Sequence, residues 1–436
     1  MARRPPIKGR RLFKLASMTA SVAGDFAGSK VRSLLRSEEE REEDLRTLRR
    51  RTGERVAETL GELKGAAMKV GQFASVAKDL LPPEVADALS ILQRSAPPMD
   101  YEVIEAQILS ELGEPPEVLF QWFDPEPFAA ASVGQVHRAR TDDGREVVVK
   151  VQYPGVDGAV DSDLSQVKLA LRLGGLVKVE RALLDSLFDE LRERLHEELD
   201  YCNEADNVRQ FHAFHAQHPR IIVPEVVGER SSQRILTMTF EDGEPLSALS
   251  APGTPQALRD TIGLRIAEMI TSQLFELSAI HADPNPANFA FRRDGSLILY
   301  DFGCVKSFSP EMHQAIVDLL VAAESLDYAS LDDAMIRLGP LRPTFAPIPP
   351  EYYDRWLDCL TPPMRTRGAY DFGASDIGGE VMKLFPGVVK RQHWFKPAPE
   401  LAMLDRAIAG HYETVRNIKA RVPLRELLLA HLPSGA

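Results

Sequence analysis

The stretch His281-Ala-Asp-Pro-Asn-Pro-Ala-Asn288, followed by Tyr300-Asp-Phe-Gly303, decides the fold of this 436-residue chain. Within it, Asp283 precedes Asn288 by five residues, and Asp301 follows thirteen residues later. Asp and Asn are common in ordinary turns, but turn chemistry alone does not explain the joint spacing. We therefore interpret the three side chains as parts of one site.

The segment between the second and third of these residues predicts how they meet. Asp294-Gly295 is a strong hairpin signal, and apolar runs lie on both sides of it. Two short strands would place Asn288 and Asp301 at neighbouring strand ends. Amide and carboxylate oxygens are ligands that suit Mg²⁺, so the hairpin predicts a metal site.

The same spacing occurs in the catalytic loop and metal-binding loop of protein kinases. In that arrangement Asp283 would orient a nucleophile, while Asn288 and Asp301 would hold Mg²⁺ against ATP phosphates. The pattern therefore indicates phosphoryl chemistry on a nucleotide.

A second Asp371-Phe-Gly373 repeats the three letters of the first. No apolar strand precedes it, and no Asn lies at the matching distance before it. We predict a loop there and a metal site at Asp301, not at Asp371.

The upstream half of the chain supplies a candidate phosphate-binding lysine. Glu146 to Gln152 is an apolar, β-branched strand carrying Lys150, and Gly134 to Arg140 with Thr141 to Gly144 predicts the preceding strand and hairpin turn. A kinase keeps the lysine that binds the α- and β-phosphates at this place. Such a lysine needs a carboxylate partner. The long helical stretch from Leu184 to Asn207 offers several, and helical periodicity leaves Glu193, Glu197 and Glu198 equal.

The glycine-rich loop of protein kinases is missing before the lysine strand. Phe128-Ala-Ala-Ala-Ser132-Val-Gly134 stands in its place. Alanine carries a Cβ that restricts the backbone, so this loop should bind phosphates differently, with the Ser132 hydroxyl as one donor. We expect nucleotide contacts from the loop residues Ala129, Ala130, Ala131, Ser132 and Val133.

Together these motifs resemble the ABC1/UbiB/ADCK family of atypical kinases, also called AarF or COQ8-like. The resemblance covers about residues 55 to 430. It is carried by Lys69-Val-Gly-Gln72, Ala129-Ala-Ala-Ser132, Val148-Val-Lys150-Val-Gln-Tyr-Pro-Gly155, Glu198-Leu-Asp200-Tyr-Cys-Asn-Glu-Ala205, His281 to Asn288 and Asp301-Phe-Gly303.

The resemblance implies an α+β, bilobal protein-kinase-like fold with an N-terminal helical extension. It implies ATP or ADP with Mg²⁺ as cofactors and favours Glu198 as the carboxylate that holds Lys150. Lys69, Gln72, Glu198 and Asp200 would form a gate over the site. The periodicity of residues 53 to 80 independently predicts a helix on which Lys69 and Gln72 are neighbours.

We expect four segments from the sequence. They are a basic and charged N-terminal segment (1–48), a helical extension (49–115), an N-lobe (116–242) and a C-lobe (243–436). The strand that begins at Arg234 would end in the hinge between the lobes, where backbone groups of Thr239, Phe240 and Glu241 would receive adenine.

The charge and cysteine content limit the kinds of partner that the chain is expected to bind. The net charge of −12 argues against nucleic-acid binding, and three dispersed cysteines fit a reducing compartment. Residues 1 to 14 carry six cations and no acid, which suits either an anionic membrane surface or a solvated tail. We expect a cytoplasmic protein without a transmembrane helix, with peripheral contact at the inner membrane left open.

The family resemblance predicts an ATP-binding atypical kinase or ATPase that supports ubiquinone or related isoprenoid-quinone biosynthesis. Isoprenoid-quinone intermediates and quinone-biosynthesis enzymes are the expected partners besides nucleotide and lipid. The main alternative is a nucleotide-responsive scaffold, or lipid extractor, without turnover. An ordinary protein kinase is disfavoured by the alanine loop, and a small-molecule phosphotransferase would lack the Lys69-to-Gln72 extension.

Overall fold

The computed structural model describes residues 98–130, 133–158, 160–161, 164–165, 168–169, 181–342, 347–391, 393–395 and 398–432, together with residues 21, 40, 43, 46–48, 50–51 and 54. The chain forms two compact units. The first comprises Met1–Ala205 and Val226–Phe240, and the second Asp206–Glu225 and Glu241–Ala436. The segment Asp206–Glu225, which the sequence analysis placed in the N-lobe, thus groups with the second unit.

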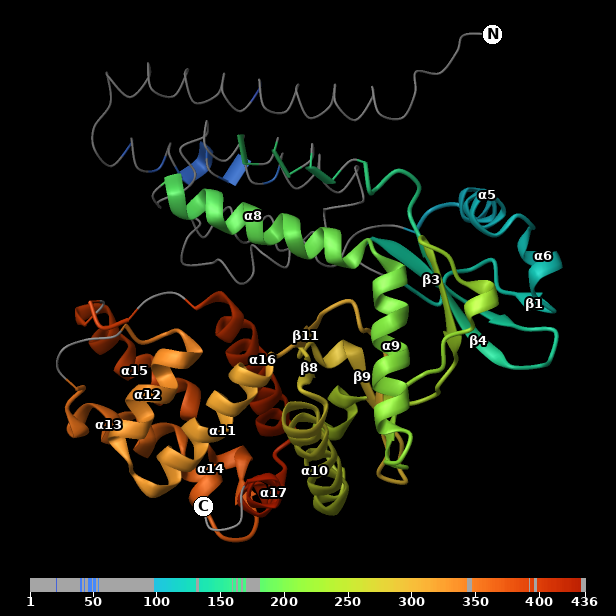
Figure 1. Ribbon diagram of the computed structural model, residues 1–436. Helices are drawn as coiled ribbons and strands as arrows, with labels where there is room; N and C mark the ends of the chain where they lie inside the picture. The colour runs from blue at the N-terminus through green and yellow to red at the C-terminus, as the bar shows by residue number, and fades with distance from the viewer. Residues whose placement is uncertain are drawn as a thin grey trace. The chain divides into compact units, whose positions relative to one another are not determined.

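The first unit is built on a five-stranded antiparallel sheet (Figure 1). Its strand order is β1-β3-β4-β6, and β2 pairs with β3. The strands are β1 (Trp122–Phe123), β2 (Ala129–Ala130), β3 (Gly134–Arg140), β4 (Glu146–Gln152) and β6 (Ile235–Thr239). Gly144 turns the β3–β4 hairpin with φ 88°, a conformation that favours glycine. The predicted hairpin with Lys150 on its second strand is confirmed.

Strand β4 explains the core of this unit. Val147, Val149 and Val151 alternate along it and are fully buried on one face. Helix α5 (Tyr101–Leu112) packs against that face with Ile104 and Ile108. The short helix α6 (Pro116–Leu119) follows it. The intervening residues of β4, including Lys150, therefore point to the other side of the sheet.

The predicted single helix from Leu184 to Asn207 is two helices. α8 (Arg181–Glu198) ends before α9 (Tyr201–His215) begins. The Asp200 side chain accepts a hydrogen bond from the Asn203 backbone N–H and so caps α9, which is a strong signal for a new helix start. The Gln152 side chain donates to the Leu199 carbonyl and ties the break to β4.

The second unit holds the three polar residues of the predicted catalytic and metal-binding loops on short strands. β9 (Phe289–Phe291) and β10 (Leu297–Leu299) form the predicted hairpin, with Gly295 at φ 90°. They lie in a four-stranded sheet of order β5-β10-β9-β7, with β5 (Ile221–Ile222) and β7 (Glu244–Pro245) at its edges. A separate two-stranded sheet pairs β8 (Ala279–His281) with β11 (Val305–Ser307).

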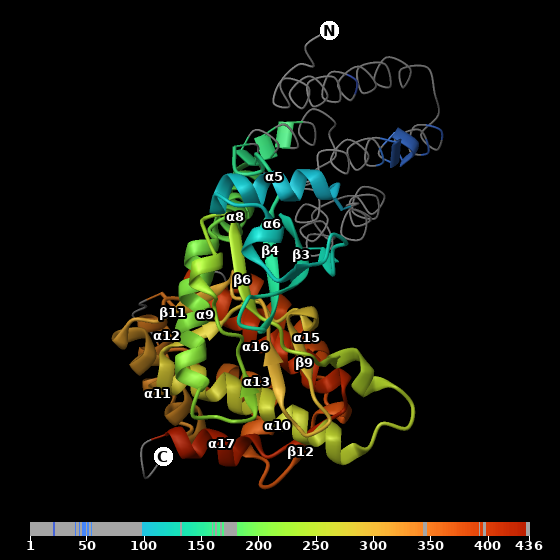
Figure 2. The same cartoon turned by 90° about the vertical axis from the view of Figure 1, so that its right-hand side faces the viewer.

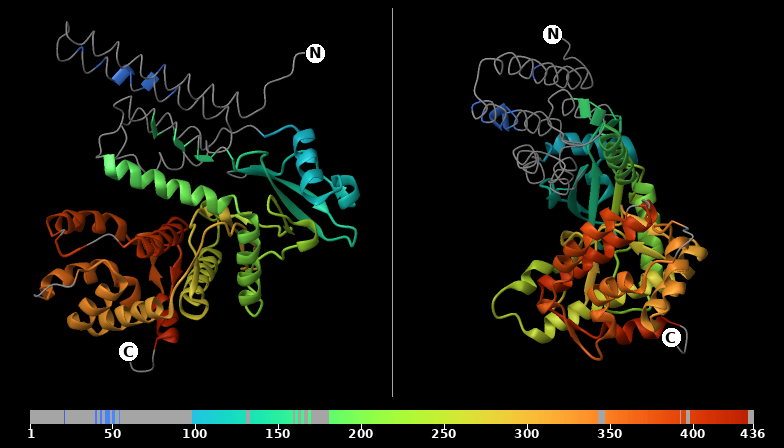
Figure 3. Two further views of the ribbon diagram at one scale, coloured as in Figure 1. Left: turned by 45° about the horizontal axis from the view of Figure 1, so that its top comes forward. Right: turned by 90° about the vertical axis from the view of Figure 1, so that its left-hand side faces the viewer.

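Helices make up most of the remainder of the second unit (Figures 2 and 3). They are α10 (Gln256–Ser272), α11 (Pro310–Ser325), α12 (Tyr328–Leu338), α13 (Pro350–Leu360), α14 (Pro362–Arg365), α15 (Ile377–Lys390), α16 (Pro399–Asn417) and α17 (Leu424–His431). A π-helical turn, Gln273–Leu277, continues α10, and β12 (Tyr370–Asp371) pairs with β13 (Arg421–Val422). Among the residues that the structure describes, no helix is both long and apolar enough to cross a membrane.

Candidate active site

Lys150 is held by a buried carboxylate of the first unit. Its Nζ lies 2.8 Å from both carboxylate oxygens of Glu204, and the two side chains are 12% and 2% exposed. Nζ also lies 4.9 Å from the centre of the Tyr201 ring, a cation–π distance. A buried ion pair is costly to desolvate, so this geometry indicates a lysine whose position matters more than its contribution to stability.

The prediction that Glu198 holds Lys150 is wrong, because Glu204 does so. Asp200 restarts the chain as a new helix, and this places Tyr201 and Glu204 at i and i+3 on one face of α9. Glu204 lies within the motif Glu198 to Ala205. An Asp200 cap predicts that a new helix starts there, and this helix start would have indicated Glu204 as the partner of Lys150. Glu198 ends α8 and is half-buried.

Asp283 and Asn288 meet at the end of β8 in the second unit. The Asn288 amide nitrogen donates to an Asp283 carboxylate oxygen at 2.9 Å. The 3-10 turn Pro286–Asn288 makes this approach possible, and the Asn285 side chain caps it. Because the amide N–H₂ faces the carboxylate, the Asn288 amide oxygen points the other way, as a ligand for a hard cation would.

Asp301 lies two residues after the end of β10, beside the end of the hairpin. One of its carboxylate oxygens accepts from the Gly303 backbone N–H at 3.0 Å, and the Tyr300 backbone N–H donates to the Asn288 carbonyl at 3.0 Å. The β9–β10 hairpin therefore brings the Asn288 and Asp301 backbones together. A carboxylate and an amide oxygen at these positions fit a Mg²⁺ ion that shares its other ligands with phosphates.

Buried, uncharged side chains form a hydrogen-bonded chain that ends at the Asp301 backbone carbonyl. The His281 ring donates through Nε2 to the Asp301 carbonyl, and the His281 backbone N–H donates to Gln273 Oε1 at 3.0 Å. Gln273 in turn donates through Nε2 to the His215 ring at 3.2 Å. Burial lowers the pKa of His281 and lowers the pKa of His215 to about 4, so both rings stay neutral near neutral pH.

Helix α16 completes this support. His411 hydrogen-bonds the His281 backbone, and both rings meet the Phe289 ring edge-on. Burial lowers the pKa of His411 to about 3. A Cβ at Gly410 would collide with the Pro284 ring, so a glycine allows α16 to approach the loop this closely. Sequence reasoning missed these residues, because none of them belongs to a local motif.

The predicted hinge residues follow β6. Thr239 ends the strand, and the Phe240 backbone N–H donates to the Glu146 carbonyl at 2.9 Å. The division between the two units falls directly after Phe240. The next residue, Glu241, accepts the Tyr300 hydroxyl on its carbonyl at 2.8 Å. Burial raises the pKa of Tyr300 to about 12, so this hydroxyl remains a donor.

Comparison with known proteins shows which family this chain belongs to. The model of the ABC1 atypical kinase-like domain matches residues 91–335. The chain belongs to the ABC1 atypical kinase-like family. The kinase-like α+β fold expected from the sequence is thereby confirmed.

Curated members of the ABC1 family are similar over most of this chain. The mitochondrial atypical kinase COQ8B of Rattus norvegicus is 30% identical over 86% of this chain and 70% of its own length. The mitochondrial atypical kinase coq-8 of Caenorhabditis elegans is 29% identical over 85% of this chain, which spans 49% of that protein. The solved complex of Rv3197 with erythromycin from Mycobacterium tuberculosis has a TM-score of 0.63 at 30% identity, covering 86% of this chain and 94% of that one.

The alanine loop of this ABC1 chain is described in part. Ala129 and Ala130 form β2, which pairs with Val136 and Gln135 of β3. Val133 is buried, and its carbonyl accepts from the Tyr153 backbone N–H at 3.0 Å. A Cβ at Gly134 would run into the Val151 carbonyl, so this glycine serves strand pairing. Two further predicted loop contacts, Ala131 and Ser132, lie outside the described residues, as do the gate residues Lys69 and Gln72.

The second Asp-Phe-Gly of this ABC1 chain is a structural corner. It is a two-residue strand and a 3-10 turn, rather than the loop that was predicted. The Asp371 side chain accepts from the Ala374 backbone N–H and lies 3.4 Å from the Arg421 guanidinium. These contacts account for Asp371 without a metal.

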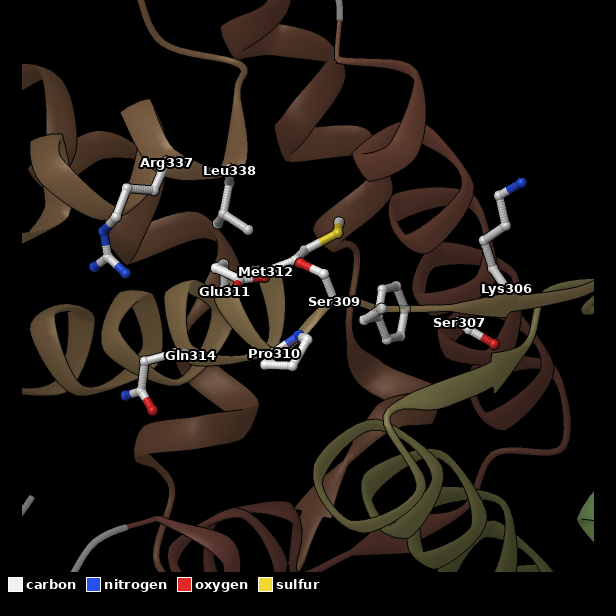
Figure 4. A pocket seen from close by; sticks show the side chains of 10 residues that line it. Lys306, Ser307, Ser309, Pro310, Glu311, Met312, Gln314, Arg337 and Leu338 are labelled. Carbon is white, nitrogen blue, oxygen red and sulfur yellow. Dashed lines mark hydrogen bonds between the residues drawn. The ribbon is translucent and has the colours of Figure 1, made fainter.

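An open hollow of about 910 Å³ lies beside β11, the strand that follows Asp301-Phe-Gly303 (Figure 4). Phe308, Met312 and Leu338 give it an apolar lining, while Lys306 and Arg337 place cations around it. Sequence reasoning did not identify this hollow, because Arg337 and Leu338 reach it from α12, a separate helix.

Proposed function

We propose that this chain is an ATP-binding atypical kinase or ATPase that uses Mg²⁺. The observation that carries the proposal is the buried bidentate pair of Lys150 and Glu204 on β4 and α9. A kinase-like nucleotide site needs a lysine fixed by a helix carboxylate. The Asp283–Asn288 contact and the position of Asp301 after the β9–β10 hairpin add the remaining parts.

In this proposal each side chain has one role. The Lys150 ammonium binds the α- and β-phosphates, and Glu204 fixes its direction. Asn288 and Asp301 would hold Mg²⁺, which supplies charge neutralisation on the phosphates when it is bound. Asp283 orients the attacking hydroxyl or water and accepts its proton, and the Asn288 amide keeps the carboxylate in place.

The gate remains part of the proposal in a revised form. Asp200 caps α9, so it sets the position of the helix that carries Glu204. Glu198 lies at the end of α8, two residues before that cap. Lys69 and Gln72 would act on this junction, and the backbone of Thr239, Phe240 and Glu241 would receive adenine. Contacts to the phosphates would come from residues 129–133.

The biological setting is inferred from relatives. The rat and worm relatives are named mitochondrial atypical kinases, and other relatives are named chloroplastic. We propose that the chain supports isoprenoid-quinone biosynthesis as a peripheral protein at the inner membrane. Quinone intermediates, or the enzymes that process them, would be its partners.

Mg²⁺-dependent phosphate release from ATP tests the proposal. We expect Asp283→Asn to lower the rate by on the order of 100-fold or more, because a positioned acid or base contributes that much. Asp371→Asn is the matched control, since it changes the same side chain in the second Asp-Phe-Gly, and we expect it to keep wild-type activity. Nucleotide affinity is measured on the same samples.

The outcomes separate the two functions under consideration. Phosphate release that depends on Asp283 supports the kinase or ATPase. Binding of ATP without turnover that depends on Asp283 would reject catalysis and favour a nucleotide-responsive scaffold. A chain that binds no nucleotide with or without Mg²⁺ would reject both.

A further inference from the structure

Helix α16 presents an arginine to the proposed catalytic loop. Arg406 and Gly410 lie at i and i+4, on the same side of this helix. Gly410 is the position at which the helix approaches Pro284 most closely, because a Cβ there would collide with the proline ring. Arg406 therefore faces the backbone that leads into Asp283.

The Arg406 guanidinium binds the peptide group that joins Ala282 to Asp283. Its Nη2 donates to the Ala282 carbonyl at 3.1 Å. Ala282 is fully buried, and its own N–H donates to the Cys304 carbonyl at 2.9 Å. Because a peptide group is planar, a contact that fixes its carbonyl also fixes the Asp283 nitrogen and the start of the loop.

The same guanidinium nitrogen also contacts the end of the proposed metal-binding tripeptide. Nη2 of Arg406 lies 3.9 Å from Sγ of Cys304, the residue that directly follows Asp301-Phe-Gly303. Sulfur is a weak acceptor, so the bond to the Ala282 carbonyl is the stronger of the two. One side chain of α16 thus contacts the residue before Asp283 and the residue after Gly303.

Stability alone does not explain an arginine at this place. Among the residues that the structure describes, Nε of Arg406 is buried and has no hydrogen-bond partner, and an unpaired buried donor costs free energy. Arg416 of the same helix is different. Its Nε donates to the Ser375 carbonyl at 2.8 Å, beside the second Asp-Phe-Gly, and its Nη1 pairs with Glu413 at 3.1 Å.

We propose that Arg406 is a positioning residue for Asp283 in the proposed phosphoryl reaction. Asn288 holds the carboxylate end of Asp283 at 2.9 Å, and Arg406 holds its backbone end through the Ala282 carbonyl. A charged donor makes a stronger hydrogen bond than a neutral one. With both ends fixed, the Asp283 carboxylate keeps one position toward the attacking hydroxyl or water. The kinetic part of this inference rests on the proposed function.

Steady-state phosphate release from Mg-ATP tests the inference on the full chain. Arg406→Met keeps most of the side-chain length without its donors. It should lower kcat by about tenfold or more and leave KM for ATP within about twofold, because a misplaced carboxylate is felt in the transition state. Arg406→Lys keeps a cationic donor and should lower kcat by only about threefold.

Arg416→Met is the matched control. It removes a guanidinium from the same helix that also donates to a backbone carbonyl, and kcat should stay within about twofold of wild type. Thermal unfolding of both methionine variants verifies that they are folded. Arg406→Gln repeats the comparison if Arg406→Met is unstable.

A double variant distinguishes positioning from a general structural role. Because Arg406 acts through Asp283, adding Arg406→Met to Asp283→Asn should lower the residual rate by less than about twofold. An arginine that served the overall fold would lower the rate by the same factor in either background.

Amide hydrogen exchange without nucleotide tests the contact independently of turnover. Peptides that cover Ala282 to Asn288 should exchange about tenfold faster in Arg406→Met than in wild type, because the start of the loop loses its anchor. Peptides that cover Phe372 to Ser375 should be unaffected. We expect the reverse pattern in Arg416→Met.

Three results would overturn the proposal. The first is loop exchange that is the same in Arg406→Met and wild type. The second is a change in KM for ATP with kcat unchanged. The third is a loss of rate that is additive with Asp283→Asn. A wild-type chain without Mg²⁺-dependent phosphate release would instead reject the proposed function, and faster loop exchange in Arg406→Met would still assign to Arg406 the positioning of Asp283.

Discussion

The chain contains the tripeptide Asp-Phe-Gly twice, and the two copies have different surroundings. Phe302 of the first copy is fully buried against the rings of Phe211 and His281. The Asp301 carbonyl accepts a hydrogen bond from Nε2 of the His281 ring. In the second copy, the Asp371 carboxylate caps a turn and pairs with Arg421, whose side chain is 55% exposed.

The same three residues therefore have different structural surroundings, and these surroundings depend on tertiary contacts rather than on the local sequence. The first copy follows a strand of a hairpin that also delivers Asn288, and neutral buried groups hold its backbone from below. In the second copy Asp371 is the last residue of the two-residue strand β12. Both Asp carboxylates accept a backbone N–H, but that of Asp371 also pairs with the exposed Arg421 guanidinium. An acid that already has these partners is poorly suited to hold a metal ion.

The largest expected effect separates the two aspartates. Asp301→Asn should lower Mg²⁺-dependent phosphate release by at least on the order of 100-fold, because an outer-sphere change alone can cost that much in a metal site. Asp371→Asn keeps the side-chain acceptor for Ala374 and should stay within about twofold. Steady-state rates across a Mg²⁺ titration measure both. An equal loss of phosphate release in Asp301→Asn and Asp371→Asn would show that the two aspartates do not differ in function.

The next effect compares a buried ion pair with an exposed one. Glu204→Gln leaves Lys150 buried without its carboxylate and should lower the free energy of unfolding by about 3–5 kcal/mol. Arg421→Gln removes the exposed partner of Asp371 and should cost less than about 1 kcal/mol. Urea unfolding of each variant gives the comparison. Glu198→Gln is a further control, and a larger loss there than in Glu204→Gln would restore the original assignment of the carboxylate.

The buried histidines near the first copy predict an acid-sensitive fold. Burial lowers the pKa of His215 to about 4 in the folded protein. Between pH 6.5 and 4, His215 is therefore protonated in the unfolded chain but neutral in the folded chain. Stability should therefore fall as the pH drops through this range. His215→Gln keeps a hydrogen-bonding side chain but does not titrate, and should remove about 3 kcal/mol of that fall.

Unfolding midpoints across a pH series test this expectation. His196→Gln serves as the control, because the His196 side chain is 47% exposed. A pH dependence of stability that is the same in His215→Gln and wild type would show that the ring does not resist protonation in the fold.

A smaller effect concerns Gln273, which hydrogen-bonds the His281 backbone before the proposed catalytic loop. Gln273→Leu removes the acceptor of the His281 backbone N–H and the donor to His215. We expect phosphate release to fall by about tenfold and to require more Mg²⁺, as for other groups that orient metal ligands. Gln273→Glu keeps the acceptor and should recover part of the loss. Gln256→Leu is the matched control, because Gln256 contacts the Lys419 carbonyl near the second copy.

The smallest effect compares the two phenylalanines. Phe302 and Phe372 are 0% and 6% exposed, so replacing either with Leu should destabilise the fold by about 1 kcal/mol. Only Phe302→Leu should also change phosphate release, because only Phe302 packs on His281. Thermal unfolding and rate measurements on the same samples decide this. Activity loss in Phe372→Leu alone would reverse the comparison.

Much of the fold could be predicted because its signals are local. Glycine turns at Gly144 and Gly295 mark the two hairpins that carry Lys150 and that join Asn288 to Asp301. Positive φ angles favour glycine in any context, so these turns were readable without tertiary information. The gate residues Lys69 and Gln72 remain a prediction.

The errors in the prediction have physical causes as well. Periodicity read a single helix through Leu199, whereas the Asp200 cap starts a new one and turns Glu204 toward Lys150. Which side of a helix is covered is also a tertiary matter. The pattern of α15 is apolar on both faces, and only packing on α13 shows that Met382 and Phe385 are the ones left outside.

The sequence by itself determined the kinds of chemical groups and their spacing along the chain. It predicted the hairpins that carry Lys150 and that join Asn288 to Asp301, because turns and alternating strands impose their geometry within a few residues. Only the tertiary structure decided which carboxylate holds the lysine and which Asp-Phe-Gly is supported. Those choices depend on contacts between residues far apart in sequence, such as Lys150 with Glu204, and burial sets their energies.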